Sequence, residues 1–342
     1  MSTSLVPVSR WHHAENRRRE ALRAAHQQDA AVLIDLLQYY LSVKSRKAGL
    51  VSASTVRSYS LAVRDFLTFC GPADRPRHAL NQLDTEVVEA YLRSLRERSL
   101  QLTSIRTYLY GVRALFRALH WAGAVGHDPA RDVRPPFDPT PAHTRKPAIP
   151  LGQVARLLTL PRELAKDERV AWRDEVLLTL GVTLGLRASE MVALDVQDVD
   201  LQVMDVHIRR GKGGRARRVP LTRSVGALLD AWLRVRAQVS SAPSGGEAPL
   251  LISFRPGRPG ARLSARGLSS IVNGYLAAAG LPKDMSGVHT LRRTAGTRLY
   301  RATRDLHVVS DLLGHASVTT SAIYAKMDTD IRREALERIE SM

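Results

Sequence analysis

The chain has 342 residues, of which 44% are hydrophobic and 25% charged, and no apolar run approaches the roughly 18 residues needed to span a bilayer. Its single cysteine, Cys70, excludes an intramolecular disulfide and a zinc site built from several thiolates. The formal net charge of +18 favours a polyanionic partner, nucleic acid before an anionic membrane surface. Residues 1–147 contain 22 Lys and Arg against 13 Asp and Glu, and the rest of the chain 29 against 20. Because both halves are basic, we expect two domains that face the same phosphate backbone.

The N-terminal half has the periodicity of amphipathic helices. Behind the candidate caps Ser52 and Ser54, one apolar stripe consists of Tyr59, Val63, Phe66 and Cys70. A second stripe, within residues 102–123, consists of Ile105, Leu109, Val112, Phe116 and Leu119. Another face of that second helix carries Arg106, Arg113 and Arg117, a row that is usually solvated but in a basic domain becomes a candidate for DNA phosphate contacts. We predict a helical domain over residues 29–123.

Two segments flank this domain. Residues 1–28 are basic but have no apolar segment of the kind found in secretory signals, so we expect a variable N-terminal extension on a cytoplasmic protein. Residues 124–150 lose hydrophobic periodicity and contain seven prolines, which disfavour helix at and before themselves. We predict that this proline-rich segment is the linker to a second domain.

The C-terminal half has a mixed pattern. Helices are predicted over residues 151–160 and 173–186 and from Ser264 to the end, with a surface loop over 240–249. Between them, Met204, Val206 and Ile208 alternate as in a strand, glycines follow at 211, 213 and 214, and RARRVPL continues as a second strand. This pattern indicates a β-hairpin. The predicted fold class is mainly α with a small β-hairpin or sheet.

The chemistry-bearing segments are dominated by Arg, His and Lys. No GxxxxGK(S/T) loop occurs, and GKGGR lacks the strand-to-helix context of a nucleotide site, so we expect no ATP. The acidic residues are scattered rather than clustered, so we expect no metal and no other cofactor. Phosphate chemistry without a metal requires fixed cations around the phosphate, a role that the planar guanidinium of Arg fills best.

Five segments occur in a characteristic order: GLRASE at 185–190, RRGKGGRARRVPL at 209–221, HTLRRT at 289–294, LLGH at 312–315, and Tyr324 nine residues after His315. In this order and spacing they resemble the tyrosine recombinase (phage integrase) family, of the Xer-like or small integrase type. The resemblance covers roughly residues 30–330, since STVRSYSLAVRDFLTFC and the helix ending in LHWAG are similar to the family's core-binding domain.

The resemblance implies a role for each matching residue. Arg187 and Arg292 would clamp a DNA phosphate in front of His315, and Tyr324 would be the nucleophile. Lys212 would protonate the departing 5′-oxygen, with Arg215 able to approach the same phosphate, and His289 would accept or relay a proton. In isolation these residues have plainer interpretations: Arg187 pairs with Glu190 on a surface, Lys212 is a solvated charge, and Tyr324 packs in a core. Arg293 points about 100° from Arg292 and is expected to face solvent or the DNA backbone.

The resemblance also implies an architecture and partners. A helical, SAM-like core-binding domain would precede a mixed α/β catalytic domain over residues 151–329. Residues 330–342 would form a helix, with Ile331, Ala335 and Ile339 on one stripe, that docks either on its own domain or on a neighbouring protomer. The implied partner is double-stranded DNA at specific sites, bound as a homo-tetramer or as a hetero-tetramer with a paralogue, and no membrane.

The implied activity is site-specific cleavage and rejoining of DNA through a 3′-phosphotyrosine. Two alternatives share the motifs or the fold: relaxation of DNA by a type IB topoisomerase, and a DNA-binding regulator without chemistry. An RNA- or membrane-binding protein would explain the charge but none of the motifs. The sequence leaves open whether the reaction serves chromosome-dimer resolution, integration of a mobile element or plasmid resolution.

Overall fold

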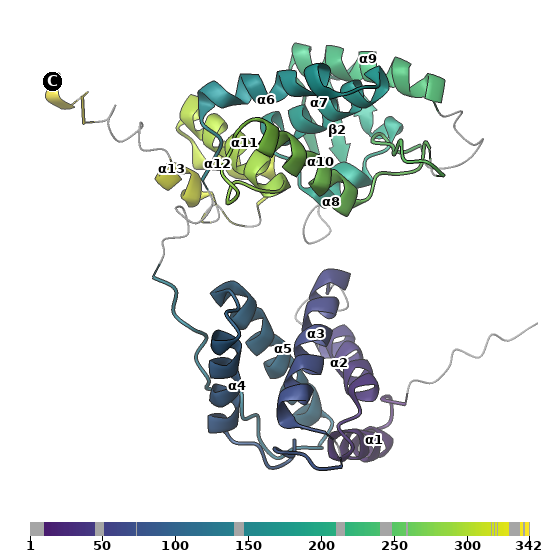
Figure 1. The fold of residues 1–342 in the computed structure, drawn as a ribbon, viewed down its shortest axis with the longest axis vertical. Coiled ribbons are helices and arrows are strands. Elements are labelled where there is room, and N and C mark those ends of the chain that lie inside the picture. Colours follow the sequence, from purple (N-terminus) through teal and green to yellow (C-terminus); the bar gives the residue numbers. More distant parts are fainter. Residues whose placement is uncertain are drawn as a thin grey trace, which may run out of the picture. The chain divides into compact units, whose positions relative to one another are not determined.

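The computed structural model describes residues 10–44, 51–72, 74–139, 147–209, 216–239, 248–257, 259–315, 317, 319, 321–327, 336–337 and 339–341. The chain divides into two compact units, one up to Pro139 and the other from Thr140 onwards (Figure 1). Each unit has its own hydrophobic core. Within the described ranges, no helix is both long and apolar enough to cross a lipid bilayer.

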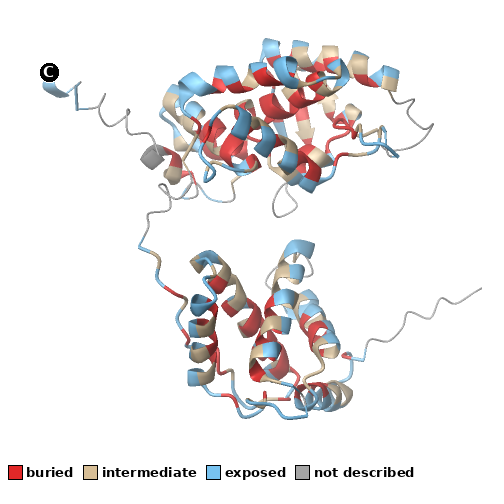
Figure 2. Ribbon diagram, viewed as in Figure 1, coloured by how far each residue is buried: buried red, intermediate tan, exposed pale blue. Residues whose placement is uncertain are grey.

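Helices make up the N-terminal unit. They are α1 (Ala14–His26), α2 (Ala30–Lys44), α3 (Ala53–Cys70), α4 (Thr85–Glu97) and α5 (Leu102–Trp121). The long helix α5 packs against α2, α3 and α4, so it forms the middle of the unit. Figure 2 shows that buried residues lie on the inner sides of these helices and exposed residues on their outer sides.

The two helices predicted from apolar stripes, α3 and α5, are confirmed. Ser52 caps α3, since its side chain accepts a hydrogen bond from the backbone N–H of Thr55 at 3.2 Å. On the shared face of the two helices, a Cβ at Gly111 would lie only 2.6 Å from the Cβ of Ala62. The glycine therefore permits the close approach of α5 to α3, and both apolar stripes are buried there or pack against the core.

The N-terminal unit extends beyond the predicted 29–123 on both sides. α1 lies within the predicted extension 1–28, yet Ala21, Ala24 and Ala25 are buried in the core together with Trp11. After α5, Ala124, Ala130 and Val133 also join this core, although they belong to the predicted linker. The prolines prevent a helix there, but they do not prevent an extended segment from burying small apolar side chains against its neighbours.

The C-terminal unit combines helices with one small sheet. Its helices are α6 (Leu151–Leu164), α7 (Glu168–Thr183), α8 (Ala188–Ala193), the short 3₁₀ helix η1 (Val196–Asp198), α9 (Arg223–Val239), α10 (Ala265–Ala278), α11 (Val288–Thr303), α12 (Leu306–Leu313) and α13 (Ala322–Met327). The predicted fold class, mainly α with a small sheet, is confirmed. The proposed C-terminal helix over 330–342 lies largely outside the described residues.

The sheet contains the predicted hairpin. β1 (Val199–Asp200), β2 (Asp205–Ile208) and β3 (Arg217–Pro220) lie in this order, and both neighbouring pairs are antiparallel. β2 begins one residue later than the pattern predicted, because Met204 adopts a left-handed backbone conformation with φ 61°. Residues 210–215, between β2 and β3, include Lys212 and Arg215 and fall outside the described residues.

Helix α11 organises the C-terminal end of this unit. It packs against α7, α12 and α13. Helix α12 ends at Gly314, which takes the left-handed conformation of a helix C-cap with φ 64° and ψ 54°. A small separate core of Val309, Leu313 and Tyr324 joins α12 to α13 and brings the C-terminal motifs onto α11.

Candidate active site

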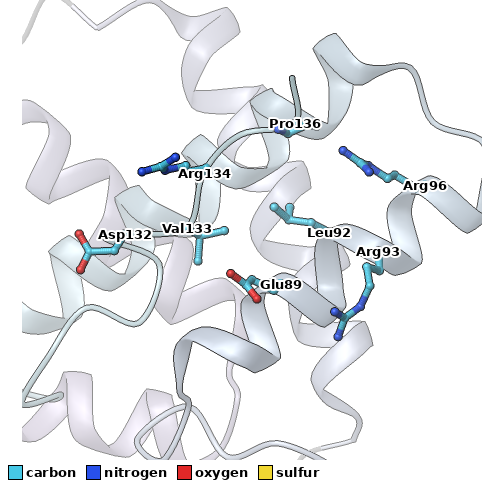
Figure 3. Close-up of a pocket in the computed structure, with 8 residues that line it drawn as sticks. All are labelled: Glu89, Leu92, Arg93, Arg96, Asp132, Val133, Arg134 and Pro136. Atoms are coloured by element: carbon cyan, nitrogen blue, oxygen red, sulfur yellow. The ribbon is translucent and has the colours of Figure 1, made fainter. Parts of the chain in front are cut away.

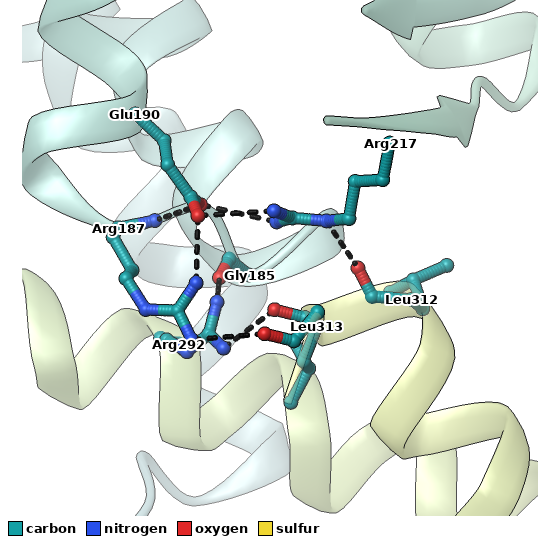
Figure 4. Close-up of polar contacts among 8 residues, drawn as sticks. Gly185, Arg187, Glu190, Arg217, Arg292, Leu312 and Leu313 are labelled. Atoms are coloured by element: carbon teal, nitrogen blue, oxygen red, sulfur yellow. Dashed lines mark hydrogen bonds and ion pairs between the residues drawn. The ribbon is translucent and has the colours of Figure 1, made fainter. Parts of the chain in front are cut away.

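The end of α12 is surrounded by guanidinium groups. Its last backbone carbonyls have no partner within the helix, and the helix dipole places partial negative charge there. Three successive carbonyl oxygens accept hydrogen bonds from three different arginines: Leu312 from Arg217 at 3.2 Å, Leu313 from Arg292 at 2.6 Å, and Gly314 from Arg187 at 3.2 Å (Figure 4). Segments far apart in the sequence thus meet at one helix end, directly before His315.

Arg292 is the most deeply buried of these arginines. It projects from α11, is only 4% exposed, and its second terminal nitrogen donates to the carbonyl oxygen of Gly185 at 2.6 Å. Burial, together with the positive charges of Arg187 and Arg217, lowers the pKa of Arg292 to about 10. The side chain is therefore a desolvated cation held in one orientation by two carbonyl groups, which suits it to bind an anion.

Arg187 begins helix α8 and is tied to Glu190. The Glu190 carboxylate accepts one hydrogen bond from the backbone N–H of Arg187 at 2.9 Å and another from its Nη1 at 2.6 Å. The ion pair considered from sequence is present, but it is buried rather than on the surface, since Glu190 is 2% exposed. Because this contact and the Gly314 carbonyl fix the guanidinium, Arg187 is oriented before any phosphate arrives.

His315 follows the end of α12 directly. Its Nδ1 lies 2.7 Å from the hydroxyl oxygen of Ser321, and its backbone N–H donates to the carbonyl oxygen of Ser310. Ser321 is fully buried and was not identified from sequence. A hydrogen bond at Nδ1 orients the imidazole ring.

Tyr324 on α13 is buried, with 4% of its surface exposed. Its ring lies parallel to the His315 imidazole, with ring centroids 6.0 Å apart and an interplanar angle of 9°. On the α11 side it packs on Gly296, where a Cβ would lie 2.6 Å from the ring. Burial raises the pKa of the Tyr324 hydroxyl, while the positive charges of Arg292, Arg293 and Arg187 oppose that rise. The phenol therefore keeps its proton at neutral pH but is surrounded by cations that would stabilise its anion.

Arg293 is closer to this cluster than the sequence predicted. It is half-buried, burial lowers its pKa, and its positive charge acts on Tyr324. The expectation that it faces solvent or DNA backbone rested on the helical angle to Arg292 alone. α13 packs on α11, so that second face of the helix is also covered.

Four of the six predicted catalytic residues thus gather around the end of α12: Arg187, Arg292, His315 and Tyr324. His289 lies exposed on the first turn of α11, one turn before Arg292. Lys212, like Arg215, lies outside the described residues, so its predicted role stays a prediction.

Sequence reasoning missed Arg217 and did not recognise Glu190 as part of the site. For Glu190 a signal existed, since a glutamate three residues after a helix N-cap typically accepts a hydrogen bond from the N-cap backbone N–H, as Glu190 does from Arg187. For Arg217 the only signal was alternation along β3, which places it on the opposite face from its neighbours.

The three arginines predicted to contact DNA have different surroundings in the N-terminal unit. Arg106 donates twice to the carbonyl oxygen of Pro136, at 3.1 and 2.9 Å. Arg113 donates to the carbonyl oxygens of Ala130 and Val133. Both side chains therefore hold the segment after α5 onto that helix, whereas Arg117 is exposed. DNA contact by these three residues stays a prediction.

A pocket of about 370 Å³ lies elsewhere in the N-terminal unit, between α4 and the segment after α5 (Figure 3). Its charged lining is mixed and consists of Glu89, Arg93, Arg96, Asp132 and Arg134. It contains none of the motif residues. The chemistry-bearing residues are instead concentrated at the end of α12 in the other unit.

Two family models match the chain. The phage integrase family matches residues 149–330, which is more than half of the chain. The N-terminal SAM-like domain of phage integrases matches residues 36–123. The matched segments lie within the units that hold the Tyr324 cluster and the α3–α5 helix pair.

Two curated relatives are similar over most of their length. Tyrosine recombinase XerC of Pseudomonas aeruginosa (strain LESB58) is 32% identical over 281 residues, which cover 81% of this chain and 86% of the relative. Tyrosine recombinase XerD of Mycobacterium leprae (strain TN) is 33% identical over 293 residues, covering 83% and 90%.

A solved structure shares the fold. XerH, a site-specific recombinase crystallised with its palindromic difH substrate after cleavage, aligns with a TM-score of 0.70 over 96% of this chain and 97% of its own, at 20% identity. The family models, the relatives and the Tyr324 cluster agree on one assignment. The chain belongs to the phage integrase family and is a tyrosine-type site-specific recombinase, an enzyme that breaks and rejoins DNA.

Proposed function

We propose that Tyr324 is the nucleophile of this recombinase and that Arg187 and Arg292 bind the DNA phosphate that it attacks. The phenolic oxygen forms a bond to phosphorus while the bond from phosphorus to the 5′-oxygen breaks, which leaves a 3′-phosphotyrosine and a free 5′-hydroxyl. The 5′-hydroxyl of a partner strand then attacks the phosphotyrosine and releases Tyr324. Because the phosphotyrosine keeps the bond energy of the phosphodiester, rejoining needs no ATP.

The observation that carries this proposal is the meeting of Arg187, Arg292, His315 and Tyr324 at the end of α12. Negative charge builds on the non-bridging phosphate oxygens during the attack, and fixed cations in a partly buried site stabilise it. Both guanidinium groups are held by backbone carbonyls, so little reorganisation is needed when the phosphate binds. The positive charge that a metal ion would supply comes in this scheme from the arginines.

Two protons move in each strand cleavage. The phenolic proton of Tyr324 leaves as the bond to phosphorus forms, and the departing 5′-oxygen gains one. We assign donation to the 5′-oxygen to Lys212, with Arg215 as the neighbouring cation, and acceptance or relay of the phenolic proton to His289. His315, oriented by Ser321, would donate to a phosphate oxygen. These assignments follow the family resemblance residue by residue.

We assign DNA binding to both units. The helical unit, with a core-binding domain over residues 29–123, and the catalytic domain over 151–329 would both contact the phosphate backbone of a specific duplex site. The net positive charge of both halves supports this arrangement, and the proposed phosphate contacts on α5 are Arg106, Arg113 and the exposed Arg117. Assembly as a tetramer of this chain, or with a paralogue, and action in the cytoplasm complete the proposal.

Deleting residues 330–342 tests the proposed docking in trans. We expect the shortened protein to bind a single DNA site as well as the full chain but to lose cooperative synapsis, because the segment would no longer reach a neighbouring protomer. Gel-shift titration measures the first property, and sizing of the synaptic complex the second. Unchanged synapsis would show that this segment docks on its own domain.

The chemistry itself is tested by mapping the covalent adduct. Purified protein is incubated with nicked suicide duplexes derived from its host genome, labelled at either end of the cut strand, and the adduct is digested for mass spectrometry. We expect the protein on the 3′-phosphate of the cut strand and the modification on the peptide that contains Tyr324. The proposal would be contradicted if the protein were attached to the 5′ end of the cut strand or through another residue. It would also be contradicted if no duplex gave an adduct.

A further inference from the structure

Arg217 contacts the active-site cluster from the hairpin. Its side chain, 13% exposed, projects from β3, and both terminal nitrogens pair with the Glu190 carboxylate at 3.0 Å (Figure 4). Its Nε donates to the carbonyl oxygen of Leu312 at 3.2 Å. One guanidinium group therefore joins β3, the start of α8 and the end of α12.

The Glu190 carboxylate is shared by two arginines. It is nearly fully buried, and a buried carboxylate is strongly destabilising unless cations and hydrogen bonds compensate it. Burial acts to raise the pKa of Glu190, but hydrogen bonds and charges from Arg217 and Arg187 hold it below its usual value. If Arg187 were the sole partner, the carboxylate would cancel its charge. With Arg217 present, the three groups together keep a net charge of +1.

Arg217 also lies against the turn that leads to His315. A Cβ at Gly314 would lie 2.9 Å from Nη1 of Arg217 and 3.0 Å from its Cδ and Cζ. Gly314 is therefore required for two reasons: its left-handed backbone and the space that the guanidinium occupies. The Arg217 guanidinium thus lies against the residue that precedes His315.

The neighbouring Arg218 provides a contrast. Successive residues of a strand point to opposite faces, and the Arg218 side chain is 64% exposed and pairs with Asp205 across the hairpin. It has the same charge and an adjacent place in the sequence but points away from Glu190. Replacing each arginine in turn removes the same charge from two different positions, so the comparison shows whether the position of the charge matters.

We propose that Arg217 is a positioning residue for strand cleavage: it neutralises Glu190, so that Arg187 keeps its charge for the DNA phosphate, and it holds the turn before His315. This inference rests on the proposed function, because it assumes that Arg187 binds the phosphate. Arg217 also connects Arg187, through Glu190, to strand β3, which follows Lys212 along the chain.

The test compares Arg217→Ala with Arg218→Ala in single-turnover cleavage of a nicked suicide duplex. Loss of a residue that orients a catalytic group without touching the substrate typically lowers activity by about 10–100-fold. We therefore expect Arg217→Ala to slow adduct formation by that range while DNA affinity changes little. Arg218→Ala should cleave at the wild-type rate. Free guanidinium ion should restore part of the cleavage rate of Arg217→Ala. Arg217→Lys keeps the charge without the paired contact, so its rate should lie between those of Arg217→Ala and the wild type.

A double variant tests the charge argument. In the Arg217→Ala background, Glu190→Gln removes the carboxylate that needs compensation, so the double variant should cleave no more slowly than Arg217→Ala alone. Fully additive losses, or wild-type cleavage by Arg217→Ala, would overturn the inference. Thermal melting shows whether Arg217→Ala is folded. If it is not, the cleavage rate of Arg217→Lys and its response to guanidinium ion test the inference instead. If the wild-type protein forms no adduct at all, the proposed function has failed rather than this inference.

Discussion

Replacing Tyr324 by phenylalanine is expected to abolish the covalent protein–DNA adduct while DNA binding is retained. The change removes one oxygen, the atom proposed to attack phosphorus, and leaves the ring that packs on Gly296 and stacks on His315. The raised pKa of the buried hydroxyl means that phenylalanine removes no charge from the resting enzyme at neutral pH. Adduct formation on nicked suicide duplexes and gel-shift affinity measure the two properties separately.

Tyr300→Phe is the matched control. Tyr300 lies on α11 and packs against the same small core as Tyr324, so the two substitutions make the same chemical change in neighbouring surroundings. We expect Tyr300→Phe to form the adduct at the wild-type rate. A Tyr324→Phe protein that still forms adduct would refute the nucleophile assignment, whereas two variants and a wild type that bind DNA without any adduct would favour a regulator on this fold.

Arg292→Lys is expected to slow cleavage by about 10²–10³-fold, the usual cost of removing one fixed donor that stabilises developing charge. Lysine keeps a positive charge but has a single terminal nitrogen, so it cannot reach the carbonyl oxygens of Gly185 and Leu313 together as the guanidinium does. The remaining carbonyl loses its buried partner, and the cation no longer has one fixed orientation. Single-turnover cleavage at saturating protein measures the effect on the chemical step.

Arg298→Lys controls for the general effect of this substitution on α11. Arg298 is exposed and donates to the carbonyl oxygen of Val182 at 3.3 Å, away from the carbonyls at the end of α12. We expect this variant to cleave and melt as the wild type does. If Arg292→Lys cleaved equally well, a fixed guanidinium at that position would not be needed, and the phosphate-binding assignment of Arg292 would be wrong.

Elements with a local signal were predicted correctly. The apolar stripes of α3 and α5, the serine cap before α3 and the hairpin strands each depend on residues only a few positions apart. Helix and strand periodicities and caps depend on such short-range patterns, so a single sequence contains them. The family is likewise identified by the order and spacing of its motifs along the chain.

Segments without periodicity were assigned less well. The predicted extension over 1–28 contains α1, and the predicted linker over 124–150 contributes Ala130 and Val133 to the N-terminal core. Whether an irregular segment is buried or extends into solvent depends on whether neighbouring helices offer it an apolar surface, and these helices can be distant in sequence. The carbonyls that bind Arg106 and Arg113 lie 17–30 residues further along the chain, so no local pattern revealed the contact.

The sequence by itself determined the fold class and the family, and it identified Arg187, Arg292, His315 and Tyr324, because residue type and spacing carry that information. The tertiary structure alone decided that Arg187, Arg217 and Arg292 converge on three successive carbonyls of one helix end, that Glu190 is buried between two of them, and that Ser321 orients His315. These contacts join residues up to 127 positions apart. Such contacts depend on how the helices pack, which a periodic pattern does not encode.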